Sequence, residues 1–147
     1  MAALINAGAN VNCKYTPTGW TPLHWACRRY PPSVECVELL LNAGAEVNAL
    51  STPAPIGGGQ RTPFDLAIIR GQNQRIYPTL LRAGASYSPQ TAATGAYLGK
   101  VRAAGGIKKY ERAHLNAIAA TFIPKLPLLP PEMVRRVVEY AFHVGDY

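Results

Sequence analysis

A nine-residue motif occurs three times in this chain of 147 residues, and the repetition constrains its fold more than any other feature. The copies are LINAGANVN at 4–12, LLNAGAEVN at 40–48 and LLRAGASYS at 80–88, with their glycines 36 and 40 residues apart. A second motif alternates with the first, as Thr21-Pro-Leu-His24 and Thr62-Pro-Phe-Asp65. Repetition at such a period is typical of solenoids, in which stacked units bury one continuous core.

The residue types within the two motifs predict a pair of helices in each unit. Thr21 and Thr62 can cap the first helices, and the proline that follows each suits the first helical position, where an N–H is not needed. The small side chains of Ala26 and Ala67 let two helices cross closely. The second helices are expected to end at the glycines of the repeated motif, where a positive φ favours glycine. These are Gly8, Gly44 and Gly84.

The alternating motifs resemble the ankyrin repeat, in which a Thr-Pro-Leu-His helix start is followed by a Leu-Leu-x-x-Gly-Ala-x-Val-Asn exit. The resemblance covers residues 1–88 and implies an all-α solenoid of paired antiparallel helices joined by β-turn hairpins. A partial repeat then spans 1–12, and two repeats span about 13–48 and 49–88. In this family the His24 ring binds backbone groups of neighbouring repeats. Asp65 departs from the pattern, so we expect weaker hydrogen bonding between repeats there.

Further departures from the family pattern predict local irregularities. Tyr30-Pro-Pro32 lengthens the turn between the helices of one repeat, and the Pro/Gly-rich stretch 49–60 lengthens a hairpin. Pro78 requires a late start or a kink in a second helix. Residues 2–12 form only the end of a repeat, without the polar cap that such arrays need. Either the chain is the remaining part of a longer array, which is the preferred interpretation, or something else covers this edge.

Residues 89–147 lose the repeat motif and are expected to form a helical cap or tail. Helices are predicted at 96–104, 107–122 and 132–142, with Gly105-Gly106 as a break and 125–131 as a rigid extended linker. The last of these helices carries an apolar stripe with helical spacing. The stripe consists of Met133, Val134, Val137, Val138, Ala141 and Phe142.

The segment Leu129–Tyr140 resembles the opening Leu-Pro-x-Glu helix of an F-box. This resemblance implies a substrate-recruiting adaptor of a ubiquitin ligase, as an alternative to a cap. The residues that would dock on the ligase scaffold are Leu129, Pro130, Glu132, Val137 and Val138. Leu126-Pro-Leu128 is also similar to the proline-rich part of a SOCS box. The F-box-like interpretation is preferred, because Ala119 stands where a SOCS box has cysteine and the spacing from Leu115 to Leu126 does not fit.

Charge and composition narrow the classes of partner. The 15 Lys and Arg exceed the 8 Asp and Glu by seven, and the excess is spread along the chain as +3 over residues 1–98 and +4 over 99–147. Nucleic-acid binding through a basic face is therefore a less favoured alternative. No apolar stretch is long enough to span a membrane and no signal peptide is visible, so an intracellular protein, cytoplasmic or nuclear and not secreted, is expected. Three cysteines without a CxxC pair predict free thiols.

The sequence offers little for catalysis. The spacing of Cys13, His24, Cys27 and Cys36 matches no zinc pattern, and packing roles are expected for Cys27 and Cys36. The stretch GGGQR at 57–61 lacks the Lys-Ser/Thr ending of a phosphate-binding loop. We expect no enzymatic activity, cofactor, metal or small-molecule ligand.

The function predicted is therefore a non-enzymatic protein–protein interaction module that uses the concave surface of the repeats. Members of this family bind partners with hairpin tips and the exposed face of each first helix, and Trp and Arg are enriched in interface hot spots. An aromatic centre with a basic rim suits an acidic or mixed protein segment. The predicted partner-binding residues are Pro17, Thr18, Trp20, Trp25, Arg28, Arg29, Arg61, Leu66, Ile69 and Arg70.

Overall fold

The computed structural model describes residues 2–53, 59–70, 74–87, 96–125 and 128–144. The chain divides into two compact units, Met1–Gly95 and Ala96–Tyr147, and each is considered by itself. In the described ranges helices dominate, and an isolated antiparallel bridge between Tyr15 and Trp20 closes a hairpin. None of the described helices combines the length and the apolar character needed to cross a membrane.

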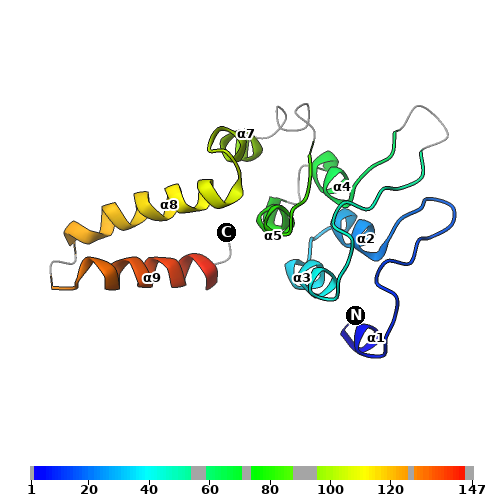
Figure 1. Ribbon diagram of the computed structural model, residues 1–147, viewed down its shortest axis with the longest axis horizontal. Helices are drawn as coiled ribbons and strands as arrows, with labels where there is room; N and C mark the ends of the chain where they lie inside the picture. The colour runs from blue at the N-terminus through cyan, green and yellow to red at the C-terminus, as the bar shows by residue number, and fades with distance from the viewer. Residues whose placement is uncertain (1, 54–58, 71–73, 88–95, 126–127, 145–147) are drawn as a thin grey trace. The chain divides into compact units, whose positions relative to one another are not determined.

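The first unit is built from pairs of helices connected by hairpins (Figure 1). Helix α2 packs against α3 and α4, and α3 packs against α5, so α2 and α4 form one layer and α3 and α5 the next. This is the arrangement that the repeat motif predicts. The elements are α1 (Ala2–Asn6), α2 (Pro22–Arg28), α3 (Val34–Asn42), α4 (Pro63–Arg70), η1 (Gln74–Ile76) and α5 (Tyr77–Arg82).

The first helix of each repeat begins at its proline, as predicted. Thr21 precedes α2 as the N-cap residue. Before α4, the hydroxyl of Thr62 accepts a hydrogen bond from the backbone N–H of Asp65 at 3.2 Å. Pro78 stands near the start of α5, directly after the short 3-10 turn η1. The late helix start that Pro78 requires is therefore confirmed.

The second helices end at glycines in the left-handed region, with φ of 80° at Gly8, 85° at Gly44 and 90° at Gly84. A side-chain bond from the preceding repeat reaches two of these turns. Asn12 Nδ2 donates to the Gly44 carbonyl at 3.1 Å, and Asn48 Nδ2 donates to the Gly84 carbonyl at 3.0 Å. The same kind of asparagine-to-glycine bond therefore occurs at both junctions between repeats.

The core of the first unit lies between the two helical layers. Phe64 is fully buried, and its ring meets Tyr77 edge-on at 5.3 Å and Tyr87 at 5.8 Å between centroids. Ala26 and Ala67 are also buried, consistent with the close packing of α2 on α4. Burial of the apolar face is what stabilises such an array, since each repeat alone leaves that face uncovered. Other fully buried side chains are Leu23, Val37, Leu40, Ile76 and Leu80.

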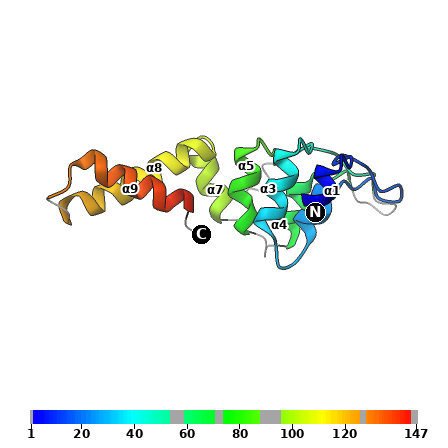
Figure 2. The same ribbon diagram turned by 90° about the horizontal axis from the view of Figure 1, so that it is seen from below.

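The second unit contains α7 (Ala96–Ala103), α8 (Ile107–Phe122), η2 (Ile123–Lys125) and α9 (Pro131–Val144). Helices α8 and α9 pack together and run antiparallel (Figures 1 and 2). The predicted bounds of α8 are confirmed. The prediction of an extended linker over 125–131 is wrong for three described residues. Lys125 belongs to η2, Leu128 lies in a turn and Pro131 begins α9. Residues 126 and 127 lie outside the described ranges.

The apolar stripe of α9 divides into a buried and an exposed row. Val134 is 2% exposed and Val138 is 9% exposed, whereas Met133, Val137 and Tyr140 are exposed. Residues four apart lie on the same face of a helix, so Val134 and Val138 form one row and Met133 and Val137 the next. The stripe is therefore wider than α8 alone covers. The side chains of Ala141 and Phe142 lie outside the described part.

Candidate functional site

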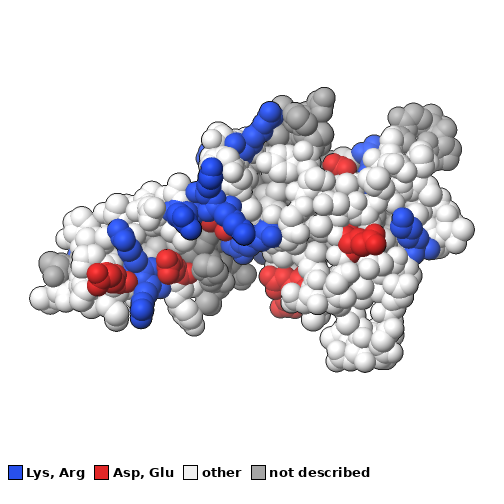
Figure 3. Space-filling model, viewed as in Figure 1, with Lys and Arg blue, Asp and Glu red and all other residues white. Residues whose placement is uncertain are grey.

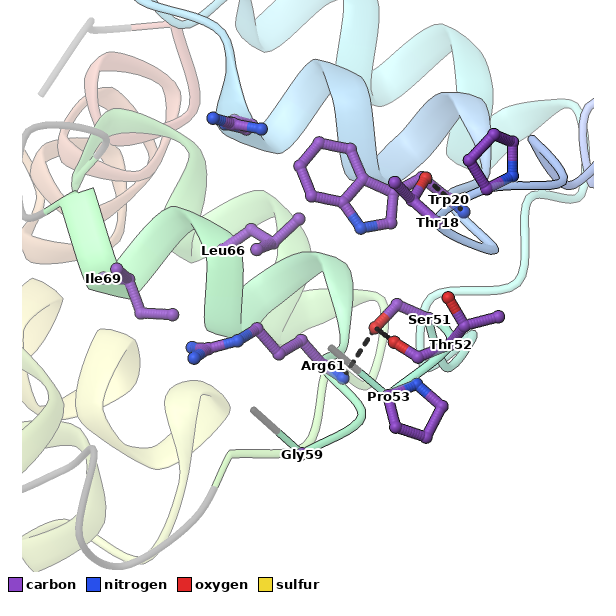
Figure 4. A pocket seen from close by; sticks show the side chains of 11 residues that line it. Thr18, Trp20, Ser51, Thr52, Pro53, Gly59, Arg61, Leu66 and Ile69 are labelled. Carbon is purple, nitrogen blue, oxygen red and sulfur yellow. Dashed lines mark hydrogen bonds between the residues drawn. The ribbon is translucent and has the colours of Figure 1, made fainter. Parts of the chain in front are cut away.

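A groove with a volume of about 360 Å³ lies between the two hairpins and the helices α2 and α4, and we call it the inter-repeat groove. Figure 4 shows Trp20 on one side and Arg61 on the other, with Leu66 of α4 between them. Of the two residues that α4 contributes, Leu66 is buried and Ile69 is 56% exposed. The residues that line it are Pro17, Thr18, Trp20, Arg28, Ser51, Thr52, Pro53, Gly59, Arg61, Leu66 and Ile69.

Most of the predicted partner-binding residues meet in this groove. Those that line it are Pro17, Thr18, Trp20, Arg28, Arg61, Leu66 and Ile69.

Trp25 and Arg29 do not line the groove, and the side chain of Arg70 lies outside the described part. In α2, Arg28 lines the groove, whereas Trp25, three residues earlier, is exposed outside it. Partner binding by Trp25, Arg29 and Arg70 stays a prediction.

Sequence reasoning missed the residues that the second hairpin contributes, namely Ser51, Thr52, Pro53 and Gly59. The two hairpins meet directly, because the backbone N–H of Thr52 donates to the Thr18 carbonyl at 2.9 Å. Gly19 permits this approach: its φ is +65°, and a Cβ there would lie 2.7 Å from the Thr52 nitrogen. These residues could have been predicted from the repeat pattern, because it implies that consecutive hairpins stack side by side.

Trp20 lies at the centre of an aromatic cluster and is half-buried. Its ring stacks on His24 at 6.4 Å between centroids and meets Trp25 edge-on at 4.6 Å. The guanidinium carbon of Arg28 lies 4.9 Å from the Trp20 ring centroid, within the range of a cation–π interaction. These contacts fix the indole at the edge of the groove. Trp20 therefore packs on its own repeat and also presents a surface to the groove.

His24 connects the two repeats behind this indole and is fully buried. The backbone N–H of Thr21 donates to Nδ1 at 3.1 Å, and Nε2 lies 3.0 Å from the Arg61 carbonyl oxygen in the next repeat. A backbone N–H only donates and a carbonyl only accepts, so these partners assign the proton to Nε2. Burial lowers the pKa of His24 below 6.5 and favours this neutral form. The contact between repeats that the resemblance implies is confirmed.

Arg61 has a fixed backbone and an exposed side chain. Its N–H donates to Ser51 Oγ at 3.0 Å, and its carbonyl accepts from the Ser51 N–H at 3.0 Å and from His24. The Cα of Arg61 is therefore held in place, so its guanidinium has a fixed point of attachment beside the groove.

The cysteines of the described part differ in their exposure to solvent. Cys27 is fully buried, and burial raises the pKa of its thiol to about 12, so it remains protonated. Cys36 is half-buried and Cys13 is exposed. Among the described residues, no three His, Cys, Asp or Glu side chains are placed to hold a metal ion.

The second unit presents a different surface. Of the residues predicted to dock on a scaffold, Leu129, Pro130, Glu132 and Val137 are exposed, but Val138 is buried and is not on that face. On the side seen in Figure 3, Lys and Arg side chains of this unit lie among Asp and Glu side chains. Such a mixture of signs does not favour nucleic acid, and binding through a basic face stays a prediction.

Comparison of the sequence with models of known protein families identifies the family of this chain. The family model "Ankyrin repeats (3 copies)" matches residues 1–91, which is more than half of the chain. The chain belongs to the ankyrin-repeat family. Ankyrin repeats are typically non-enzymatic modules of protein–protein interaction, so protein partners are indicated.

Curated relatives match part of this chain. It is 40% identical over 73 residues to human ankyrin repeat and SOCS box protein 16, a match that covers 50% of the chain and 14% of that protein. It is 43% identical over 49 residues to human and mouse ankyrin repeat domain-containing protein 40, covering 33% of the chain and 13% of each relative. The chain thus spans a small part of the length of these relatives. No solved structure matches it.

Proposed function

We propose that this chain is a non-enzymatic protein-binding module whose recognition surface is the inter-repeat groove. The observation that carries the proposal is the convergence of seven predicted partner-binding residues, from both repeats, on one groove. Interfaces take most of their binding energy from a few aromatic and arginine residues in packed, desolvated positions. Trp20, Arg28 and Arg61 supply those residue types here, and Leu66 and Ile69 supply apolar surface.

Affinity purification with the full chain tests this proposal. Ile69→Asp places a charge on an exposed residue of the groove, so it should remove a group of co-purified proteins without unfolding the repeats. The matched control is Leu39→Asp on α3, because Leu39 is 41% exposed and does not line the groove. Quantitative mass spectrometry of both eluates is the measurement. Equal recovery of every protein by wild type and Ile69→Asp would show that the groove binds none of them.

A second function, recruitment of a ubiquitin-ligase scaffold through α9, is supported by its exposed apolar residues. Val137 is 59% and Tyr140 73% exposed, and Leu129 is 43% exposed, so the F-box-like segment leaves apolar side chains uncovered. The SOCS box in the name of one human relative gives a further reason for considering an adaptor.

Pull-down of ligase-scaffold subunits, with Val137→Asp as the test variant and the exposed Arg135→Asp as control, tests this second function. Recovery that is lost only with Val137→Asp supports an adaptor. Absence of scaffold subunits from the wild-type eluate argues against it.

A further inference from the structure

The inter-repeat groove carries two positive charges that none of its described lining residues balances. Arg28 and Arg61 are the charged residues of the lining, and the others are neutral. Neither guanidinium forms an ion pair with a described carboxylate. Both are exposed, whereas Leu66 beside them is buried. Two arginines against apolar surface form a site for an anionic group, since a guanidinium binds a carboxylate through two parallel hydrogen bonds.

The Arg28 side chain and the Arg61 backbone are held before any partner binds. The Arg28 guanidinium lies over the Trp20 ring, and the backbone of Arg61 is fixed by Ser51 and His24. A side chain that is already restrained loses less conformational entropy on binding, so the contact of Arg28 with Trp20 favours affinity.

The backbone of the two hairpins is not available for pairing with a partner strand at this point. The Thr52 N–H already donates to the Thr18 carbonyl, and the Ser51 N–H donates to the Arg61 carbonyl. Recognition by addition of a β-strand needs free backbone groups along an edge. These paired groups favour recognition of side chains by the groove. Its volume of about 360 Å³ is at the lower end of the range for ligand pockets and suits a few side chains of an extended segment.

The geometry points to one kind of partner, an extended acidic peptide segment whose Asp or Glu carboxylate binds Arg61, in a groove to which Arg28 adds a second positive charge. An apolar side chain close to that carboxylate packs on Trp20 and Ile69. This inference rests on the proposed function of the groove and adds the chemistry of its ligand. The charge of the groove selects the acidic residue.

A positional library of synthetic nine-residue peptides, probed with the purified full chain, tests the inference. The residues offered at each position include Glu, Gln, Lys, phosphoserine and the apolar amino acids. Peptides with Glu or Asp near Leu, Ile or Phe should be selected, and replacing that Glu by Gln should weaken binding about tenfold. Arg61→Gln should abolish this discrimination and keep the apolar preference. Arg61→Glu should select Lys at the acidic position.

The control is Arg75→Glu, a charge reversal at an exposed arginine of the same repeat outside the groove, which should leave the selection unchanged. Peptides that need Ile69 but show no acidic preference would overturn the inference and leave the proposed function standing. Preference for phosphoserine over Glu by about tenfold would overturn the assignment of a carboxylate. Peptide binding that Ile69→Asp does not weaken would overturn the proposed function itself.

Discussion

The first helices of the two repeats begin with the similar motifs Thr-Pro-Leu-His and Thr-Pro-Phe-Asp, and the fourth residue, His24 in the first and Asp65 in the second, makes different contacts. Both side chains return to the N–H of the preceding threonine, at 3.1 Å for His24 Nδ1 and 2.9 Å for Asp65 Oδ2. His24 also reaches the next repeat through Nε2, whereas the hydrogen bonds of Asp65 within the described residues go to Thr62. The difference shows that capping a helix and joining two repeats are separate tasks. An imidazole performs both because its nitrogens lie on opposite edges of the ring.

The largest expected effect is the loss of stability when the side chain of His24 or of Asp65 is removed. His24→Ala leaves the buried Thr21 N–H and the Arg61 carbonyl without this partner, so it should lower the free energy of unfolding by about 1–3 kcal/mol. Within the described residues, Asp65→Ala removes a local helix-start contact with Thr62, and it should cost about 1 kcal/mol. Urea unfolding followed by tryptophan fluorescence measures both, since Trp20 and Trp25 lie in the first repeat. An equal or greater loss with Asp65→Ala would contradict the comparison.

The second effect is a pH dependence that belongs to His24. Burial lowers its pKa in the folded state below the unfolded value of 6.5, so the unfolded chain binds the proton first as pH falls. Stability is therefore full above about pH 6.5 and decreases below it, down to the folded-state pKa, by at most about 1.4 kcal/mol per pH unit. Unfolding of wild type and His24→Gln from pH 7.5 to 5 measures the difference. Identical pH profiles of the two proteins would show that His24 is not responsible.

The smallest expected loss of stability comes from removing an asparagine contact that occurs at both junctions between repeats. Asn12 and Asn48 each donate to a glycine carbonyl of the next repeat, and their Oδ1 atoms accept from the N–H groups of Glu46 and Ser86 at 2.8 and 2.9 Å. Asn12→Ala and Asn48→Ala should each cost about 0.5–1.5 kcal/mol in the same unfolding assay, because these bonds are exposed. A loss confined to one variant would show that the two junctions are not equivalent.

Much of the helical structure was predictable because local signals determine it. The bounds of α8 follow from its apolar period and the flanking Gly106, and the late start of α5 follows from Pro78. The asparagine ties were not predicted, although Asn12 and Asn48 stood in the repeated motif. Their role depends on a carbonyl more than 30 residues away, and no local propensity reports such a contact.

Part of the candidate site was predictable, whereas most of the second hairpin's share was not. Arg28, Leu66 and Ile69 could be placed because helical spacing determines which side chains share a face. The second hairpin's share of the groove depends on the contact of Thr52 with Thr18, which Gly19 permits. Such a contact between hairpins is long-range in sequence. The division of the α9 stripe into a buried and an exposed row likewise depends on how α8 covers it.

The paired hydrogen bonds of Ser51 and Arg61 have a consequence for engineering the protein. They close the base of the longer hairpin, while Asn48 and His24 fix the register of the repeats outside it. The entropy of closing a loop grows only slowly with its length, so a longer insert between these two residues costs little stability. A sequence grafted after Thr52 would therefore leave the hairpin contact of Thr52 with Thr18 and the stacking of the repeats in place, although it would alter the part of the groove that Pro53 and Gly59 line.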